Sequence, residues 1–370
     1  MKLTVDVSAL SAALGTVTHA LAVRVPKPVM EGVLLDARDD QLVMTCTDGH
    51  FAIECNVPCQ VENPGRIVFS GRFLADMIRK LPSGDVSLTV DEGNVGRIRC
   101  GGVRTSLMGM DPMEFPEMAE VEGGRHIHLS QLALKNMISR VSFAVAVDEA
   151  RQILTGILME LRPGEVRLVA LDGFRLAMQT AKVTGDTEVK ELTRIICPGK
   201  VMTELSRILA DEETDCDICF DDRHMQVRFG STLLSTVLMS GQYIDYERIL
   251  PQSFTTRTKL DRSQLSSAID FASLYAREAK NNLVKINCDG NLFGISSNAE
   301  LGDFHQDIEI YQDGPGVQIA FNAKYLTDVL RAVPDEEICM NFNTSIHPCV
   351  ITPVEGEDYL YLILPVRVFQ

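Results

Sequence analysis

The chain has 370 residues, of which 45% are hydrophobic, and its formal net charge at pH 7 is −16. That length predicts two or three domains, each with enough apolar residues for its own core. No apolar run approaches the roughly 20 residues of a membrane span, and Lys2 and Asp6 interrupt the N-terminal pattern, so we expect a soluble, cytoplasmic protein with no membrane partner.

A short strand followed by a helix is the first element that the pattern predicts, with the helix over residues 8–22. The same element recurs at residues 130–145 and 262–280. In each copy the apolar residues return at helical spacing. They are Leu10, Leu14, Val17 and Leu21, then Leu134, Ile138, Val141 and Val145, then Leu265, Ile269, Ala272 and Ala276. Three copies of one amphipathic element indicate an internal repeat.

Strands with alternating apolar residues follow each of these helices. The first group, which begins just after tight turns, covers residues 42–47, 166–171 and 292–297. A second group leads directly into another helix and covers residues 67–69, 195–197 and 319–321. A third group follows that helix at residues 86–90, 216–220 and 338–342. Each repeat is therefore predicted to run helix, strands, helix, strands.

The second helix of each repeat carries the most informative pattern in the chain. In the segments 70–82, 198–210 and 321–334, a basic, an acidic and a basic residue are spaced so that they share one side of a helix. We name this side the charged stripe. Its three sets are Arg72, Asp76 and Arg79; Lys200, Glu204 and Arg207; and Lys324, Asp328 and Arg331. Apolar residues occupy the opposite side of each helix.

The spacing of these sets is the length of a domain, which is much longer than a solenoid repeat. Two short segments rich in proline, glycine and polar residues, at 116–125 and 251–256, are the expected linkers. We therefore predict an α+β protein of three repeated domains with two helices packed on antiparallel sheets in each. The predicted domains are residues 1–124, 125–253 and 254–370.

Metal and catalytic chemistry find little support in the sequence. Cys216 and Cys219 form a C-x-x-C motif, but an odd offset in a strand sends their side chains to opposite faces. His126 and His128 share a strand face without nearby partners in the sequence. We interpret the ten cysteines as reduced, mostly buried thiols. Because no Walker A, G-x-S-x-G, H-E-x-x-H or G-x-G-x-x-G motif occurs, we predict no catalytic site, no metal and no cofactor.

Charge is unevenly distributed along the chain. The six predicted helices hold twelve basic and five acidic residues, a net +7, which leaves −23 for the remainder. Helices on a common surface would form a weakly basic stripe able to attract phosphates. The alternative is a solvated face with ion pairs inside each helix, such as Arg72 with Asp76. Three copies of the pattern favour a repeated ligand over this alternative.

The threefold repeat and three short segments resemble one known family. The segments are residues 171–177 (LDGFRLA), 246–251 (YERILP) and 364–367 (LPVR). Over the whole chain these features are similar to the bacterial DNA polymerase III beta subunits, the sliding clamps. The resemblance implies a non-enzymatic processivity factor. Two subunits of three clamp domains each would join head to tail into a ring, with helices inside and sheets outside.

The resemblance also implies which residues meet DNA and the second subunit. Double-stranded DNA, bound without regard to sequence, would pass through the ring. The DNA-contacting residues are Arg24, Arg72 and Lys200 by resemblance, with Arg79, Arg207, Lys324 and Arg331 added from the charged stripe. The homodimer interface would join Thr105, Ser106, Leu107 and Met108 of one subunit to the region of Leu274 and Tyr275 in the other.

A partner-peptide groove is implied between the second and third repeats. Its ligands would be the DNA polymerase III catalytic subunit, the clamp loader, and other clamp-binding polymerases and repair proteins. The matching residues are Leu154, Gly173, Phe174, Arg175, Leu176, Arg248, Ile249, Leu362, Leu364, Pro365, Val366 and Arg367. The chain departs from the family motif at Leu171, usually Thr, at Phe174, usually His, and at Ile244, often Pro. We therefore expect a groove that is more apolar than usual.

Two other functions stay open on the sequence alone. A dimeric scaffold or ligand-binding protein would use its acidic outer surface and leave the charged stripes solvated. An enzyme with a site assembled across repeats has no motif in its favour. Retention on circular but not on linear DNA distinguishes a clamp from a scaffold.

Overall fold

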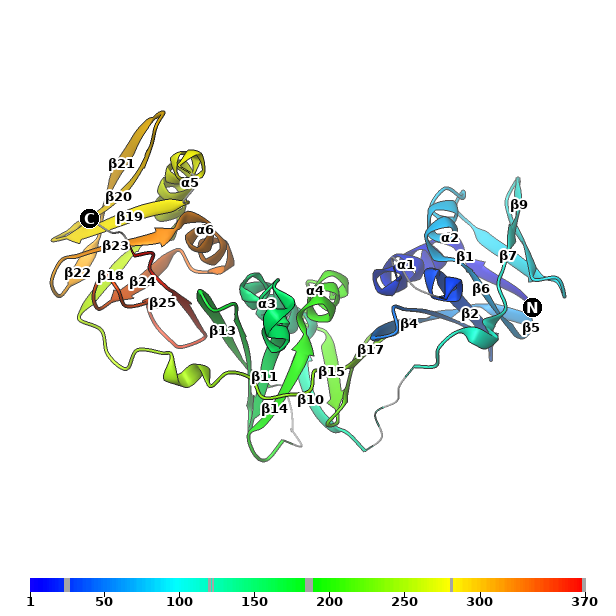
Figure 1. Ribbon diagram of the computed structural model, residues 1–370. Coiled ribbons are helices and arrows are strands. Elements are labelled where there is room, and N and C mark those ends of the chain that lie inside the picture. The colour runs from blue at the N-terminus through cyan, green and yellow to red at the C-terminus, as the bar shows by residue number, and fades with distance from the viewer. Residues whose placement is uncertain (23–26, 119–120, 122, 184–188, 280–281, 368–370) are drawn as a thin grey trace. The chain divides into compact units, whose positions relative to one another are not determined.

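The computed structural model describes residues 1–22, 27–118, 121, 123–183, 189–279 and 282–367. The α-helices in these ranges are α1 (Val7–Val17), α2 (Gly71–Ile78), α3 (Gln131–Val141), α4 (Gly199–Ile208), α5 (Arg262–Glu278) and α6 (Ala323–Ala332). They occur as three pairs, one pair in each repeat (Figure 1). Each helix lies where the apolar spacing predicts one, so the prediction of repeated helices is confirmed. The predicted ends of the first two were wrong, because α1 ends at Val17 and α3 at Val141, and Leu21 and Val145 have extended backbone.

Capping side chains fix where the first helix of each repeat begins. Asp6, Ser130 and Asp261 each precede that helix and accept a hydrogen bond from the backbone N–H three residues later, at 3.0, 3.1 and 2.8 Å. A cap of this kind satisfies a backbone donor that the helix itself leaves unpaired. The three helices therefore start at equivalent points of their repeats.

The chain divides into two compact units, and the boundary passes through α3 and α4. The first unit holds the first repeat and part of the second. Its smaller sheet has the order β5-β1-β7-β8-β9 and consists of β1 (Lys2–Asp6), β5 (Gln60–Asn63), β7 (Asp85–Val90), β8 (Val95–Cys100) and β9 (Val103–Met108). Its larger sheet has the order β10-β15-β16-β17-β4-β3-β2-β6 and consists of β2 (Gly32–Arg38), β3 (Gln41–Thr47), β4 (Phe51–Pro58), β6 (Gly65–Ser70), β10 (Arg125–Ser130), β15 (Asp215–Phe220), β16 (His224–Phe229) and β17 (Thr232–Val237).

The second unit holds the remainder of the second repeat and the third repeat. Its larger sheet has the order β14-β11-β12-β13-β26-β25-β24-β18-β22 and consists of β11 (Gly156–Arg162), β12 (Glu165–Leu171), β13 (Arg175–Lys182), β14 (Thr193–Pro198), β18 (Thr256–Asp261), β22 (Tyr311–Asp313), β24 (Glu337–Phe342), β25 (Cys349–Pro353) and β26 (Tyr359–Ile363). Its smaller sheet has the order β21-β20-β19-β23 and consists of β19 (Leu283–Asp289), β20 (Leu292–Ala299), β21 (Gly302–Glu309) and β23 (Val317–Asn322).

Each large sheet joins strands of two repeats through one antiparallel pair. In the first unit β17 pairs with β4, and Leu234 lies opposite Ile53. In the second unit β13 pairs with β26, and Ala177 lies opposite Tyr361. The junctions between repeats are therefore continuous hydrogen-bonded sheet. This is why the second repeat is shared between the two compact units.

The amphipathic register of the second helix is confirmed in all three repeats. Leu74, Leu205 and Leu326, on the predicted apolar side, are at most 2% exposed. Arg72 and Lys324, at the start of the charged stripe, are exposed. In the first unit α1 packs against α2, and in the second unit α5 packs against α6.

The cysteines are mostly buried, and the two histidines of β10 pair with aspartates. All ten cysteines are free thiols and eight of them are buried, and burial raises the pKa of Cys197 to about 12. His126 and His128 pair with Asp217 and Asp215 on β15, at 2.9 and 3.2 Å. These are partners that the sequence order had concealed. Among the described residues no three ligating side chains are grouped to hold a metal ion.

In the described ranges, every helix is too short or too polar to cross a membrane.

Candidate functional site

The segment between β12 and β13 forms a tight turn that its own side chains hold. Asp172 accepts hydrogen bonds from the backbone N–H groups of Phe174 and Arg175, at 2.9 and 3.1 Å. Gly173 has a φ of 92°, a left-handed conformation that suits glycine. The turn leaves Phe174 58% exposed while Arg175 is 8% exposed. Two adjacent residues thus have opposite environments.

Arg175 is held by three acceptors. Its guanidinium donates to Asp172 at 3.0 Å, to Asp328 of α6 at 2.6 Å and to the Phe143 carbonyl oxygen at 2.6 Å. It also lies over the rings of Phe143 and Tyr325, 5.2 and 4.7 Å from their centroids. Burial raises the pKa of the Asp328 carboxyl, but hydrogen bonds from Arg175 and from Lys324 outweigh burial and lower this pKa. Arg175 therefore links α6 to the second repeat.

An exposed apolar surface surrounds Phe174. The Phe174 ring stacks on Tyr325 with 6.1 Å between centroids, and its carbonyl oxygen accepts a 2.8 Å hydrogen bond from the Leu364 N–H. Leu364 and Pro365 are half-buried and Val366 is 39% exposed. We name Phe174, Tyr325, Leu364, Pro365 and Val366 the Phe174 face. Exposed aromatic and aliphatic groups at the ends of the paired strands β13 and β26 suit an apolar ligand side chain.

The twelve residues predicted for the groove divide by exposure. The buried ones are Leu154, Arg175, Leu176 and Leu362. The accessible ones are Gly173, Phe174, Arg248, Ile249, Leu364, Pro365, Val366 and Arg367. The three buried leucines belong to one apolar cluster that packs against Leu364. Buried members can shape the floor of a binding surface, and only the accessible ones can touch a ligand.

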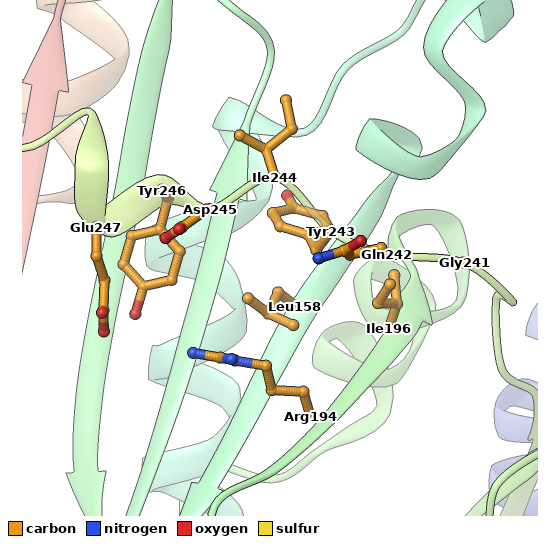
Figure 2. Close-up of a pocket in the computed structure, with 10 residues that line it drawn as sticks. All are labelled: Leu158, Arg194, Ile196, Gly241, Gln242, Tyr243, Ile244, Asp245, Tyr246 and Glu247. Atoms are coloured by element: carbon orange, nitrogen blue, oxygen red, sulfur yellow. The ribbon is translucent and has the colours of Figure 1, made fainter.

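A cavity of about 420 Å³ lies beside β11 and β14, under the chain segment at residues 241–247 (Figure 2). Leu158 and Ile196 lie on the strands, and Tyr243 and Tyr246 of the covering segment line the side of the cavity (Figure 2). The lining residues are Leu158, Arg194, Ile196, Gly241, Gln242, Tyr243, Ile244, Asp245, Tyr246 and Glu247. None of them is among the twelve residues predicted for the groove, although Ile244 was one of the three departures from the family motif.

A buried carboxylate anchors the covering segment. Glu160 is 0% exposed and accepts hydrogen bonds from Arg194 Nε at 2.7 Å and from the Tyr246 hydroxyl at 2.8 Å. Arg162 and Arg167 also lie 3.2 and 3.8 Å from its oxygens. Burial raises the pKa of Glu160, but the hydrogen bonds and the guanidinium charges outweigh burial and lower it. Burial, with the hydrogen bond to Glu160, raises the pKa of Tyr246 to about 12.

Protonation of Glu160 is expected to destabilise the protein in acid. Because the folded state lowers its pKa, the carboxylate stabilises the fold above the unfolded pKa, and this contribution is lost as the pH falls through the folded pKa. Glu160→Gln should lower stability by about 3 kcal/mol at neutral pH, since it removes the buried carboxylate that accepts hydrogen bonds from Arg194 and Tyr246. Glu337→Gln, on an exposed acid of β24 that pairs with Lys259 at 2.8 Å, is the control. Thermal unfolding from about pH 7 to about pH 3 measures both effects, and wild-type stability of Glu160→Gln would contradict them.

The acidic residue of each charged stripe forms an ion pair inside its helix. Asp76 pairs with Arg79, Glu204 with Arg207, and Asp328 with Lys324. The alternative pairing of Asp76 with Arg72, considered from the sequence, is not the one formed. Glu204 and Asp328 each contact a second basic side chain from a preceding repeat, His19 at 2.8 Å and Arg175 at 2.6 Å.

The remaining basic residues of the stripe lie on the helix surfaces. Arg72, Lys200 and Arg331 are exposed, and within the described chain no ion pair to Arg72 or Arg331 is found. Arg24, which was predicted to contact DNA, lies outside the described residues.

One strand predicted for the dimer interface, and one strand beside the other predicted region, lie at sheet edges. β9, with Thr105, Ser106, Leu107 and Met108, ends the five-stranded sheet, and β21 ends the four-stranded sheet. Beside β21, α5 exposes 51% of Phe271 and 55% of Leu274. The ring of Phe304 on β21 stacks with Phe271 and with Tyr275, at 4.9 and 6.3 Å. An edge strand beside exposed apolar groups is typical of a surface that another chain covers.

Family models of the DNA polymerase III beta subunit match three consecutive parts of the chain. The N-terminal domain model matches residues 1–119, the central domain model residues 128–245 and the C-terminal domain model residues 247–367. The chain belongs to the DNA polymerase III beta subunit family.

Relatives in this family are similar along nearly the whole chain. Beta sliding clamps of Staphylococcus epidermidis and Staphylococcus aureus are each 31% identical over 360 residues, which cover 95% of both chains. The crystal structure of the DNA polymerase sliding clamp from Bacillus subtilis matches with a TM-score of 0.96 and 31% identity over all of both chains. The beta subunit of Thermotoga maritima matches with a TM-score of 0.92 and 28% identity, again over all of both chains. The protein is a DNA sliding clamp that supports the processivity of DNA polymerase III, built of three clamp domains.

Sequence reasoning missed two aromatic residues of this beta subunit. Tyr325, which stacks on Phe174, follows Lys324 on α6, and Phe73 and Val201 take the same offset in the other two repeats. An apolar residue at that offset in every copy was a usable signal. Phe143 was missed because it lies inside the helix predicted over residues 130–145 and off its apolar side, whereas α3 ends at Val141 and Phe143 is in a 3-10 turn.

Proposed function

We propose that the protein closes as a homodimer into a ring around duplex DNA and tethers the DNA polymerase III catalytic subunit, without catalytic activity of its own. The threefold repeat of helices with one charged stripe carries this proposal, because equivalent helices around an axis suit a ligand bound without regard to sequence. Its proposed domains are residues 1–124, 125–253 and 254–370. Its proposed place of action is the cytoplasm, on bacterial DNA.

The charged stripe is the proposed DNA-contacting surface. The residues are Arg24, Arg72, Arg79, Lys200, Arg207, Lys324 and Arg331. The acid of each stripe is already paired with a cation, so each helix attracts phosphates only weakly. Weak, equivalent phosphate contacts let a ring move along the duplex while the closed ring prevents escape.

Reversing three of these charges is expected to impair retention on DNA without unfolding the protein. The variant is Arg24→Glu with Arg72→Glu and Lys200→Glu, which replaces attraction of phosphates by repulsion. A matched control makes the same change at exposed arginines of sheet strands, Arg99→Glu with Arg228→Glu and Arg257→Glu. Retention on primed circular DNA in gel filtration is the measurement. If the helix variant behaves like wild type, the helices do not face the duplex.

Ring closure is proposed to repeat the strand pairing that joins repeats within the chain. Strands at similar distances after the same helix of each repeat are equivalent. After the second helix, β9 of the first repeat corresponds to β17 and β26 of the other two. After the first helix, β21 of the third repeat corresponds to β4 and β13. The pairs β17–β4 and β26–β13 form inside the chain, which leaves β9 and β21 for pairing between subunits. By the same register, Thr105 of one protomer would lie opposite Phe304 of the partner subunit.

Exposure in the first repeat supports this closure. The Asp76 side chain is 65% exposed, whereas its counterparts Glu204 and Asp328 are each 17% exposed because a preceding repeat contacts them. Phe73, the counterpart of Tyr325, is 56% exposed. A second subunit would cover Phe73 and Asp76 as the preceding repeat covers their counterparts.

The Phe174 face is proposed to bind short peptides of partner proteins. These partners are the DNA polymerase III catalytic subunit, the clamp loader, and other clamp-binding polymerases and repair proteins. The exposed Phe174 and Val366 over the buried leucine cluster support this proposal. Each apolar anchor gains about 25 cal/mol per Å² of surface removed from water, so a few anchors can supply most of the affinity.

A further inference from the structure

Two adjacent residues of α6 belong to the two surfaces proposed above. Lys324 is part of the charged stripe, and Tyr325 is part of the Phe174 face. Asp328 follows both by one helical turn, so its side chain lies beside both. The Asp328 side chain is 17% exposed, whereas that of Lys324 is 67% exposed. Asp328 therefore lies where the proposed DNA-contacting surface and the proposed peptide-binding surface meet.

A single oxygen of Asp328 contacts both surfaces. Its Oδ2 accepts one hydrogen bond from Lys324 Nζ and another from Arg175 Nη1, each at 2.6 Å. The two donors carry like charges, so each weakens the attraction of the other to that oxygen by mutual repulsion. The Arg175 side chain is only 7% exposed, and scarce water leaves this repulsion poorly screened. The strength with which Asp328 holds Arg175 therefore depends on the charge of Lys324.

The equivalent acid of the second repeat is arranged differently. Glu204 contacts Arg207 through Oε1 and His19 through Oε2. A separate oxygen for each basic side chain lessens the competition between them. Competition for one oxygen is thus found on the helix that adjoins the Phe174 face.

Arg175 holds the Phe174 face in shape. Its guanidinium carbon lies 4.7 Å from the centroid of the Tyr325 ring, which stacks on Phe174. Its Nε and its backbone N–H both donate to Asp172, at 3.0 and 3.1 Å, in the turn that presents Phe174. An arginine that is held more firmly restricts both the ring beneath it and the turn beside it. A face that is restricted in advance loses less conformational freedom when a peptide binds.

We infer that Asp328 is a positioning residue that couples the two surfaces, so that DNA at Lys324 strengthens peptide binding on the Phe174 face. This inference rests on the proposed DNA-contacting and peptide-binding functions. A phosphate neutralises the Lys324 ammonium and draws it from Asp328, which leaves that carboxylate to Arg175. Because the coupling of two binding equilibria is reciprocal, a bound peptide also strengthens the attraction of Lys324 for phosphate. Partner peptides therefore prefer a clamp on DNA to a free clamp.

Fluorescence anisotropy of a labelled leucine- and phenylalanine-containing peptide tests this coupling on the full chain. Lys324→Met removes the charge that a phosphate neutralises, so it should bind the peptide about fivefold more tightly than wild type. Asp328→Asn should weaken the peptide, and Lys324→Met should give no gain in that background, because the shared carboxylate is absent. The matched control is Lys259→Met, which removes a lysine paired with Glu337 at 2.8 Å on strands of the same unit. It should bind the peptide as wild type does.

A short DNA duplex in excess at low salt provides the second measurement. It should raise the peptide affinity of wild type by about fivefold and leave that of Lys324→Met unchanged.

The outcomes separate the coupling from the functions on which it rests. Failure of the peptide to bind wild type would overturn the peptide function of the Phe174 face, and the coupling with it. Failure of the duplex to bind wild type at low salt would overturn the DNA-contacting role of the charged stripe, again with the coupling. If both ligands bind, equal peptide affinity of wild type and Lys324→Met would overturn the coupling alone. A gain from Lys324→Met that persists in the Asp328→Asn background, or a duplex effect that persists in Lys324→Met, would do the same.

Discussion

Leu274→Asp is expected to convert the proposed homodimer into a monomer and to abolish retention on circular DNA. Leu274 is 55% exposed on α5, beside the edge strand β21 that we propose to pair with β9 of the partner. A carboxylate buried there without a cation costs several kcal/mol. The dimer dissociation constant should rise by about 100-fold or more. Loss of the closed ring then removes the topological hold on DNA, although every charged stripe is intact.

Light scattering at micromolar concentration and retention on primed circular DNA measure these two effects. Tyr311→Asp is the matched control, because Tyr311 is 69% exposed on β22, an edge strand of the other sheet in that unit. It should leave both dimer and retention unchanged. A wild type that is monomeric at micromolar concentration, or a Leu274→Asp variant that stays dimeric, would contradict ring closure through this edge.

Removal of residues 364–370 is expected to abolish binding of polymerase and clamp-loader peptides while the dimer stays intact. The deletion removes Leu364, Pro365 and Val366 from the Phe174 face. It also removes the hydrogen bonds from the Leu364 N–H to the Phe174 carbonyl oxygen and from the Val366 N–H to the Ala320 carbonyl oxygen, each at 2.8 Å. Because anchors of this kind dominate the affinity of short peptides, binding should fall below detection.

Titration of a leucine- and phenylalanine-containing peptide into wild type and the deletion variant measures this effect. Phe174→Ala separates loss of the anchor from loss of the chain end, and it should weaken the peptide by about tenfold or more, since it removes one aromatic side chain from the face. Equal affinity of wild type and the deletion variant would place the partner site elsewhere. Loss of the dimer in the deletion variant would contradict the separation of the two surfaces.

The sequence by itself determined the threefold repeat, the six helices and their orientation toward the core. Helix register is a local property, because the spacing of Leu205 and Leu209 relative to Lys200 is enough to decide which side is buried. The alternation of apolar residues located the strands in the same way. The charged stripe followed from these registers, and its lysines and arginines lie on the surface as the pattern requires.

Only the tertiary structure decided which distant residues meet. The sequence grouped Arg175 with the residues of a binding groove, yet its guanidinium is buried against Asp328, 153 positions away. Glu160 meets Arg194 and Tyr246 across gaps of 34 and 86 positions, and no local pattern marks such a set. The cavity and the strand pairs between repeats are likewise formed by segments that are far apart in the sequence. Periodicity specifies the face on which a side chain lies, whereas its partners depend on how sheets from different repeats come together.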